Sequence, residues 1–405
     1  MAIRRGVLIG LIVCGSVLGW AAARAACTAQ VVGGQFVIDG CDVVITNGNL
    51  FVRNGSGSTA TANGKGNLVV GYNESRGAGK DHRTGSHNLV VGQRHNFTSY
   101  GGLVVGYENE TSGTYATVNG GSENVASGPY AAVAGGRVNT ASGAYASITG
   151  GQYGAAVGGS SMVLGGWNNR AGANFATVAG GRDNVATSST PGDPYSLSYA
   201  TVSGGYGNGA SGNSSSVSGG QLNQATGPYA SVSGGQSNLA SGAAASVSGG
   251  LDNDASGSSA AASGGYHNHA TGNWSSATGG TLNSATFDYS SVTGGRANQA
   301  SGSAASVSGG FDGLASGEDA SVSAGWENDA SGLYTSVSGG YRNHATAWAA
   351  SVSGGYQNHA DGSTSSVTGG YVNVAEGQSA TVSGGFSREA AEANSWTAGE
   401  LHQDF

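Results

Sequence analysis

The densest group of ionisable side chains, and so the first candidate for acid–base chemistry, lies between residues 80 and 95. It lies in a stretch where two successive Gly corners, Gly71 and Gly92, are separated by a step of 21, although the step is 15 through most of the chain. The longer step predicts a loop, and loops run over protein surfaces. We therefore interpret the group as a solvated loop rather than an active site. Its members are Lys80, Asp81, His82, Arg83, His87, Arg94 and His95.

Four histidines could bind a transition metal, because imidazole is a common ligand of such ions. His267 and His269 form an H-x-H pair, and His344 and His359 are separated by one repeat. The sequence shows no third or fourth ligand for either pair, so it predicts no metal site and no cofactor. Calcium-binding nonapeptide solenoids need Asp at a fixed place in every repeat. Here the aspartates are scattered: Asp252, Asp254 and Asp329.

Motifs of catalysis and of nucleic-acid binding are missing from the sequence. There is no G-x-S-x-G nucleophile elbow, no phosphate-binding loop and no zinc-type spacing of Cys. The repeat also lacks the clustered carboxylates or Arg that a solenoid polysaccharide lyase or hydrolase needs on one face. Only 15 Lys and Arg oppose 23 Asp and Glu, for a net charge of −8, which argues against binding to a phosphate backbone. We expect a protein that is not an enzyme.

An aromatic column is the strongest candidate for a binding surface. The residue after the corner Gly is aromatic in 10 of 19 repeats, without interruption in the last six. The column has two interpretations: a ladder stabilised by ring stacking or buried in a subunit contact, or an exposed stripe that binds a glycan or a protein. A second, broken aromatic column runs from Tyr115 to Tyr334. The aromatic stripe, as we call the last six residues, comprises Phe311, Trp326, Tyr341, Tyr356, Tyr371 and Phe386.

These residues are positioned by a 15-residue repeat. The last Gly of each corner recurs once per repeat from Gly106 to Gly181, and again from Gly205 to Gly385. Between Gly181 and Gly205 the step is 24. The nine extra residues, near 188–197, include a Pro-Gly-Asp-Pro segment, which predicts a loop insertion.

Each repeat contains one clear strand pattern. In Ala230-Ser231-Val232-Ser233, apolar and polar residues alternate with period two. Val or Ile fills the Val232 position in 16 of 18 complete repeats, which predicts a core column. The length of the repeat allows two short strands and two tight corners. One turn buries too little to repay its lost entropy, so turns must stack. The predicted fold is an all-β, narrow, single-stacked β-solenoid with Val and Ala inside.

An Asn column accompanies the Val column. Asn fills its place in 16 of 19 repeats, and Gly154, Gly313 and Arg388 are the exceptions. Because Asn and Gly both tolerate positive φ, we expect a left-handed corner residue there. A ladder of stacked Asn side chains is compatible with this.

The serines on either side of the Val column predict a regular outward row of hydroxyls. Flat solenoid faces with such rows can order water, so ice binding is a further hypothesis. Faces of that kind usually carry Thr, whereas Ser dominates here.

Residues 1–25 have the pattern of a secretory signal peptide. Two Arg precede an apolar run at 6–23, and small residues precede a cleavage site after Ala25. The run is short and interrupted by Gly, which does not favour a membrane span. We expect an exported protein in which Cys27 and Cys41 form a disulfide, although two unpaired thiols are the alternative.

The repeats resemble those of a known family. Their Ser-Val-Ser-Gly-Gly corners, with Asn88-Leu89-Val90-Val91-Gly92 and Leu103-Val104-Val105-Gly106, are similar to the YadA-like head repeats of trimeric autotransporter adhesins. The similarity covers about residues 65–386. It implies a left-handed parallel β-roll, a homotrimer, and an adhesive role at the cell surface or outside the cell, with a protein or glycan ligand. The alternative function is that of a secreted glycan-binding solenoid, or of an ice-binding one.

Both ends of the repeat domain are expected to carry caps, because an open solenoid end is an exposed sheet edge. In the N-terminal cap, residues 26–64, Asp42–Thr46 and Leu50–Val52 are expected strands joined by an Asn-Gly turn. The β-roll spans 65–386. The C-terminal cap, 387–405, is expected to begin with a short helix at Ser387–Ala393.

Overall fold

The computed structural model describes residues 28–32, 35–39, 42–188 and 198–399, and the chain divides into two units, Met1–Phe51 and Val52–Phe405. In the first unit, β1 (Thr28–Val32) and β2 (Gln35–Asp39) pair antiparallel, with Thr28 opposite Asp39. The expected signal peptide, Cys27 and Cys41 lie outside the described residues.

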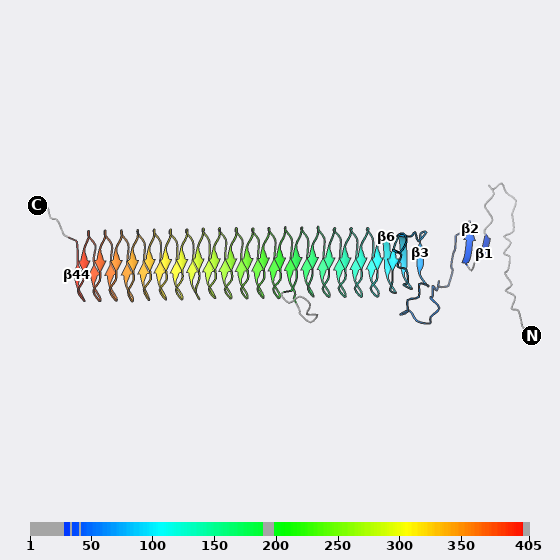
Figure 1. Cartoon of the computed structure of the whole chain (residues 1–405), viewed down its shortest axis with the longest axis horizontal. Helices are drawn as coiled ribbons and strands as arrows, with labels where there is room; N and C mark the ends of the chain where they lie inside the picture. Colours follow the sequence, from blue (N-terminus) through cyan, green and yellow to red (C-terminus); the bar gives the residue numbers. More distant parts are fainter. Residues whose placement is uncertain (1–27, 33–34, 40–41, 189–197, 400–405) are drawn as a thin grey trace, which may run out of the picture. The chain divides into compact units, whose positions relative to one another are not determined.

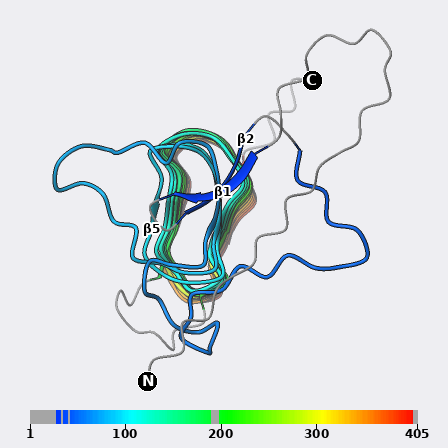
Figure 2. The same ribbon diagram turned by 90° about the vertical axis from the view of Figure 1, so that its right-hand side faces the viewer.

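The second unit is a parallel β-solenoid of two facing sheets (Figures 1 and 2). The first sheet begins with β3 (Leu68–Val70), β4 (Leu89–Gln93) and β6 (Leu103–Tyr107), and the second with β5 (Asn96–Phe97). All later strands are two residues long. The even-numbered strands recur once per repeat from β8 (Thr117–Val118) to β16 (Thr177–Val178), and from β18 (Thr201–Val202) to β44 (Trp396–Thr397). The odd-numbered strands do so from β7 (Glu110–Thr111) to β17 (Val185–Ala186), and from β19 (Gly209–Ala210) to β43 (Glu389–Ala390).

Strand pairing confirms the repeat. Each residue pairs in parallel with the residue one repeat later, as in Ser216 with Ser231. The pairing continues across the longer step that follows Gly181, where Thr177 pairs with Thr201 and Val185 with Gly209. The expected loop at 188–197 falls almost wholly outside the described residues, but the sheets on either side of it stay in register.

The core consists of four small side chains per turn. In one turn Asn223, Ala225 and Ala230 are fully buried, and Val232 is 1% exposed. The predicted Val column and inward Ala are thus confirmed. So little apolar area comes from each turn that stacking is what makes the fold stable.

Close contact between turns explains the corner glycines. Gly220 has φ +85°, and a Cβ there would lie 2.2 Å from the carbonyl oxygen of Gly235. A side chain is excluded both by its left-handed backbone and by the next turn. A Cβ on the neighbouring Gly219 would have no atom within 4 Å.

The expected left-handed Asn is wrong. The left-handed residue is the one before it, such as Leu222 with φ 55°, and a second lies near the opposite corner, such as Tyr229 with φ 59°. The Asn instead points into the core. In this column the expected ladder is confirmed: Asn223 Oδ1 accepts the N–H of Asn238 at 3.0 Å. Asn223 Nδ2 donates to Gly219 O at 2.8 Å and to Gly235 O at 2.9 Å.

Two strands expected before the solenoid are not found. Residues 42–46 and 50–52 are non-strand and exposed, although Asn47 between them has the positive φ (56°) of the expected turn. A strand needs a hydrogen-bonded neighbour, and β1 and β2 pair with each other instead.

The helix expected at 387–393 is wrong as well, and no helix occurs in the part of the chain that the structure describes. The segment forms one more solenoid turn: Glu389 of β43 pairs with Val374, and the Arg388 N–H donates to Asn373 Oδ1 at 2.9 Å. The edge of the preceding turn offers these backbone partners, which outweighs the helix propensity of an Ala- and Glu-rich segment. Among the described residues no helix is long and apolar enough to cross a membrane.

Candidate functional site

Residues 80–87 of the group lie in a tethered loop between β3 and β4, whereas Arg94 and His95 follow β4. Arg76 and Arg83 hold the loop, because their guanidinium groups donate to main-chain oxygens of other turns and of the loop itself. Arg76 Nε donates to Arg94 O at 2.6 Å, and Arg83 Nε to His95 O at 3.1 Å. Arg76 also lies 3.7 Å from Glu110 Oε2. These contacts are those of a loop fixed to a scaffold.

The contacts of Asp81 within this loop indicate a structural role. Its carboxylate accepts hydrogen bonds from the Ser75 hydroxyl at 2.5 Å and the Arg76 N–H at 2.8 Å, and it lies 3.3 Å from Arg83 Nη2. The bond from Ser75, followed by that from the Arg76 backbone, lowers the pKa of Asp81. A carboxylate held in its charged form is a weak general base.

His95 occupies the first place in the buried Asn column. Its Nδ1 accepts the N–H of Asn109 at 3.2 Å, as an Asn Oδ1 does elsewhere. Its Nε2 lies 3.0 Å from Val91 O, four residues earlier, where an Asn Nδ2 would donate. The ring is therefore neutral with the proton on Nε2, and burial lowers the pKa of His95. Sequence inspection missed this role because the step from His95 to Asn109 is one residue shorter than a full repeat.

The other members of the group point to separate partners. Arg94 Nη1 lies 3.1 Å from Glu108 Oε1 and 3.0 Å from the Tyr107 hydroxyl. His87 Nδ1 lies 3.2 Å from Thr59 O, beside an open hollow of about 410 Å³ that Arg53, Asn54 and Thr59 also line. A second open hollow of about 400 Å³ is lined by Lys80 and His82 with Arg76, Asn96, Glu108 and Glu110.

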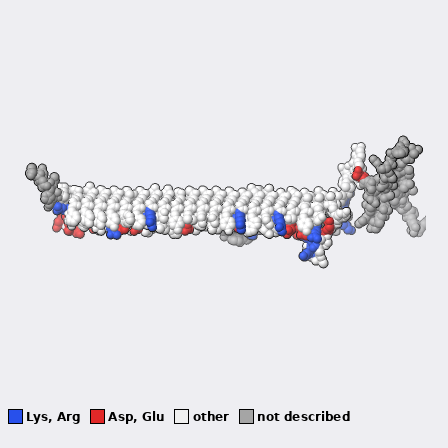
Figure 3. All heavy atoms as spheres, turned by 90° about the horizontal axis from the view of Figure 1, so that it is seen from above, with Lys and Arg blue, Asp and Glu red and all other residues white. Residues whose placement is uncertain are grey.

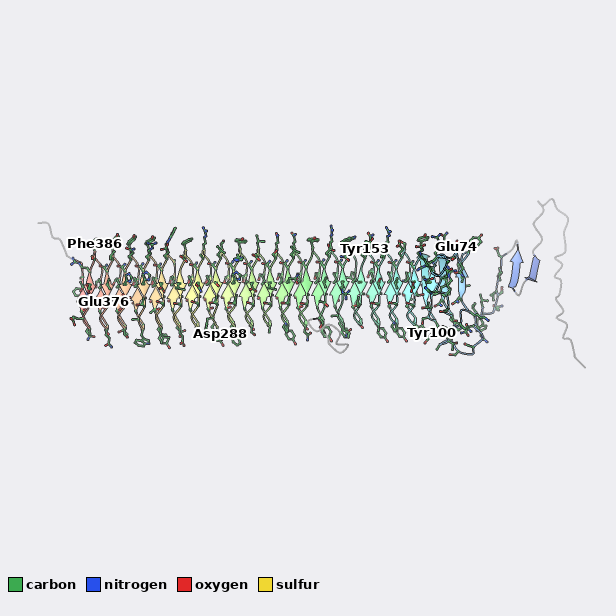
Figure 4. All side chains as sticks on the ribbon, in the orientation of Figure 1. Glu74, Tyr100, Tyr153, Asp288, Glu376 and Phe386 are labelled. Carbon is green, nitrogen blue, oxygen red and sulfur yellow. The ribbon has the colours of Figure 1, made fainter. Side chains whose placement is uncertain are left out.

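The aromatic stripe lies along one edge of the solenoid, and its last four rings form a continuous stack, whereas Trp326 is tilted by 34–38° against Phe311 and Tyr341. Figure 4 places Phe386 and Tyr153 on this edge, and Tyr100 and Asp288 on the opposite one. The rings of Tyr341, Tyr356, Tyr371 and Phe386 are nearly parallel, with interplanar angles of 3–10° and centroids 4.6–5.2 Å apart.

This stacking bears on what the stripe can bind. Tyr356 and Tyr371 each turn both ring faces toward the rings of the neighbouring turns, so it is mainly their ring edges that meet solvent. Glycan recognition by stacking needs an open ring face. Such a face exists at the end of the stack, where Phe386 is 69% exposed.

The second aromatic column lies on the opposite edge, where its rings stack in short groups rather than in one long run. Tyr130 and Tyr145 stack at 5.0 Å and 2°, and Trp274 and Tyr289 at 5.1 Å and 5°. All four have left-handed φ between 53° and 60°. Both aromatic columns are thus ladders in which a ring contacts the next turn.

The outer side of the first sheet forms a surface that we call the hydroxyl face. Between Thr201 and Ser383 it has 26 outward positions, two per turn, and all but Ala261 are Ser or Thr. None of them carries a charge. The charged side chains gather instead along one long side of the solenoid, and the opposite long side is free of them (Figure 3). The outward row of hydroxyls expected on either side of the Val column is thus present.

Of the histidines considered as ligand pairs, His269, His344 and His359 lie on the outer side of the second sheet, whereas His267 is a left-handed residue at the edge just before it. His344 and His359 stack with centroids 4.7 Å apart, and His267 and His269 are also 4.7 Å apart but nearly perpendicular. Each has a carboxylate nearby. As their side chains stand, no three His, Cys, Asp or Glu of the described residues converge to hold a metal ion.

No protein-family model matches this chain, and no curated protein matches it significantly.

Proposed function

We propose that the chain is an exported, non-enzymatic protein that acts at the cell surface or outside the cell as an adhesin-like rod, built from left-handed YadA-like head repeats. The observation that carries the proposal is the hydroxyl face. Thirteen successive turns present Ser or Thr, with Ala261 as the one exception, at a constant spacing. Such a surface suits an extended contact better than the capture of a small molecule, which needs a concave site.

We further propose that the protein is a homotrimer and that the hydroxyl face lies in the subunit contact. Burying charges in an interface costs desolvation energy, and this face has none to bury. A contact along it would also add buried area to turns whose own core is only Asn, two small residues and Val.

Light scattering on a sizing column tests the assembly. The mature wild-type protein should have the mass of a trimer. Ser306→Lys with Ser308→Lys places two charges on the hydroxyl face and should give monomers. The matched control, Gln299→Lys with Ser301→Lys, changes the outer side of the second sheet in the adjoining strand and should stay trimeric. A monomeric wild type would refute the trimer.

Export and surface exposure need a separate test in the source cells. Fractionation should find the protein outside the cytoplasm, with residue 26 as the N-terminus, and protease added to intact cells should degrade it. Retention in the cytoplasm would refute the proposed location.

Ice binding is the second candidate, and the flatness and uniformity of the hydroxyl face favour it. A monomeric protein with this face open to water should show thermal hysteresis, which the Ser306→Lys/Ser308→Lys variant should lose. Absence of hysteresis in the wild type would remove this candidate. The glycan-binding alternative depends on the aromatic stripe, whose open ring face is at Phe386.

A further inference from the structure

We propose that the open hollow beside His87 binds an acidic saccharide, that is, a sugar unit that carries a carboxylate or a sulfate group. The hollow has a volume of about 410 Å³ and lies between residues of the segment 53–59 and His87. The choice of a saccharide rests on the proposed adhesive function outside the cell, and the site names a class of ligand for that function.

The charges around the hollow favour an anion. Among the described residues, its lining contains one guanidinium, that of Arg53, and no carboxylate, although the chain as a whole has 23 Asp and Glu against 15 Lys and Arg. In the second hollow, of about 400 Å³, two carboxylates, Glu108 and Glu110, balance the cations instead. Because a guanidinium binds a carboxylate or sulfate through two parallel hydrogen bonds, Arg53 is the expected partner of the anionic group.

The backbone of the segment offers further hydrogen-bond donors. Gly55 and Gly57 have positive φ (78° and 82°), whereas Ser56 between them does not. Successive N–H groups in turns of this kind form concave nests that bind anions. The N–H groups of both glycines, of Ser58 and of Thr59 meet no acceptor among the described residues. All four residues line the hollow, so these donors can serve a ligand there.

Hydrogen bonds hold the hollow in shape. Asn54 is only 6% exposed, its Oδ1 accepts the N–H of Ser56 at 2.9 Å, and its Nδ2 donates to Thr61 O at 2.8 Å. His87 ties the segment from the other side. Its Nε2 accepts the N–H of Asn54 at 3.3 Å, so its Nδ1 carries the proton and donates to Thr59 O at 3.2 Å. A site formed before the ligand arrives costs less entropy on binding.

The size of the hollow favours a sugar over a free inorganic anion. Its volume of about 410 Å³ is in the range of small-molecule sites and leaves room for a sugar ring beside the anionic group. Ser58 and Thr59 line it as well, and their hydroxyls can donate to and accept from the hydroxyls of a sugar. We therefore expect recognition by polar contacts rather than by stacking on an aromatic ring.

The experiment is a calorimetric titration of the full mature protein at low and matched ionic strength with four probes. Sialyllactose carries a carboxylate, sulfated N-acetylglucosamine carries a sulfate, lactose carries neither, and sodium sulfate has no sugar. At least one acidic saccharide should bind, and the tighter of the two identifies the anionic group. Lactose should not bind, and sodium sulfate should bind more weakly than that saccharide.

Arg53→Gln should weaken the binding of the acidic saccharide at least about tenfold, because its charge-assisted hydrogen bonds are lost. Arg53→Lys keeps the charge without the two-pronged geometry, so its affinity should be intermediate. Arg53 is exposed, so both variants should fold, which an unchanged mass in light scattering would verify. The matched control is Lys80→Gln, which removes a cation from the second hollow and should leave the affinity unchanged.

Four results would overturn the site: neither acidic saccharide binds, lactose binds as tightly as they do, Arg53→Gln binds as wild type does, or Lys80→Gln weakens binding as much as Arg53→Gln. Equal affinity for sodium sulfate would overturn the assignment to a saccharide. These results are distinct from a failure of the proposed function. A monomeric wild type would refute the trimer and still allow this binding to be measured, whereas an exported trimer that binds no acidic saccharide would refute the site alone.

Discussion

Replacement of Asn223 by Ala should uncouple the turns on either side of it. The amide forms two bonds to glycine carbonyls and accepts two from Asn238, one from its N–H and one from its side chain, at 2.8–3.1 Å. At about 1 kcal/mol net for each bond, the expected loss of local stability is about 3–4 kcal/mol. The matched control is Gln224→Ala, which removes an exposed amide from the next residue.

Hydrogen exchange is the suitable assay, because a stacked repeat protein need not unfold in one step. About 1.4 kcal/mol corresponds to a factor of ten, so the segment around Asn238 should exchange at least about 100 times faster in Asn223→Ala than in Gln224→Ala. A difference below about threefold between the two variants would refute the view that the Asn ladder holds the turns together.

Three further predictions concern a corner, a buried ring and the stripe. Gly220→Ala should cost at least about 2 kcal/mol of unfolding free energy by urea denaturation, because its Cβ would lie 2.2 Å from the next turn; Gly219→Ala should be nearly neutral, and equal losses would contradict the corner argument. Because the pKa of His95 is lowered by burial, its contribution to stability should be complete above about pH 6.5 and decline as pH falls from there toward the lower folded pKa. His95→Asn should flatten this part of the pH profile, and an unchanged profile would count against the neutral ring. Trp326→Ala with Tyr341→Ala should lower stability by about 1–3 kcal/mol and leave a glycan-array signal unchanged, whereas a lost signal would show that the stripe binds glycans.

The period and the core were predictable because they depend on side chains. Val232 and its equivalents recur at the same position of the repeat. Burial of one such side chain per repeat requires strands that stack on one another. Gly220 could likewise be identified as a corner, since no other residue type fits its contact with Gly235.

The left-handed positions were not predictable, because their side chains carry no signal. Val138 has φ 54° although β-branched residues avoid this region. Its backbone is imposed by the stack: its N–H donates to Ser122 O in the preceding turn at 3.0 Å. The same imposed geometry turns Glu389 and Ala390 into a strand against their helix propensity.

Exact in-register pairing also makes the length of this rod adjustable in whole units. If one repeat within 205–385 were removed or duplicated, the residues of each column would still lie above one another. The Asn, Val and Gly of the turns that become neighbours would then form the same contacts as before. Each unit would change the length by one strand spacing, about 4.8 Å. A chain with one repeat more or fewer should therefore fold equally well, so the number of repeats sets the length of the solenoid.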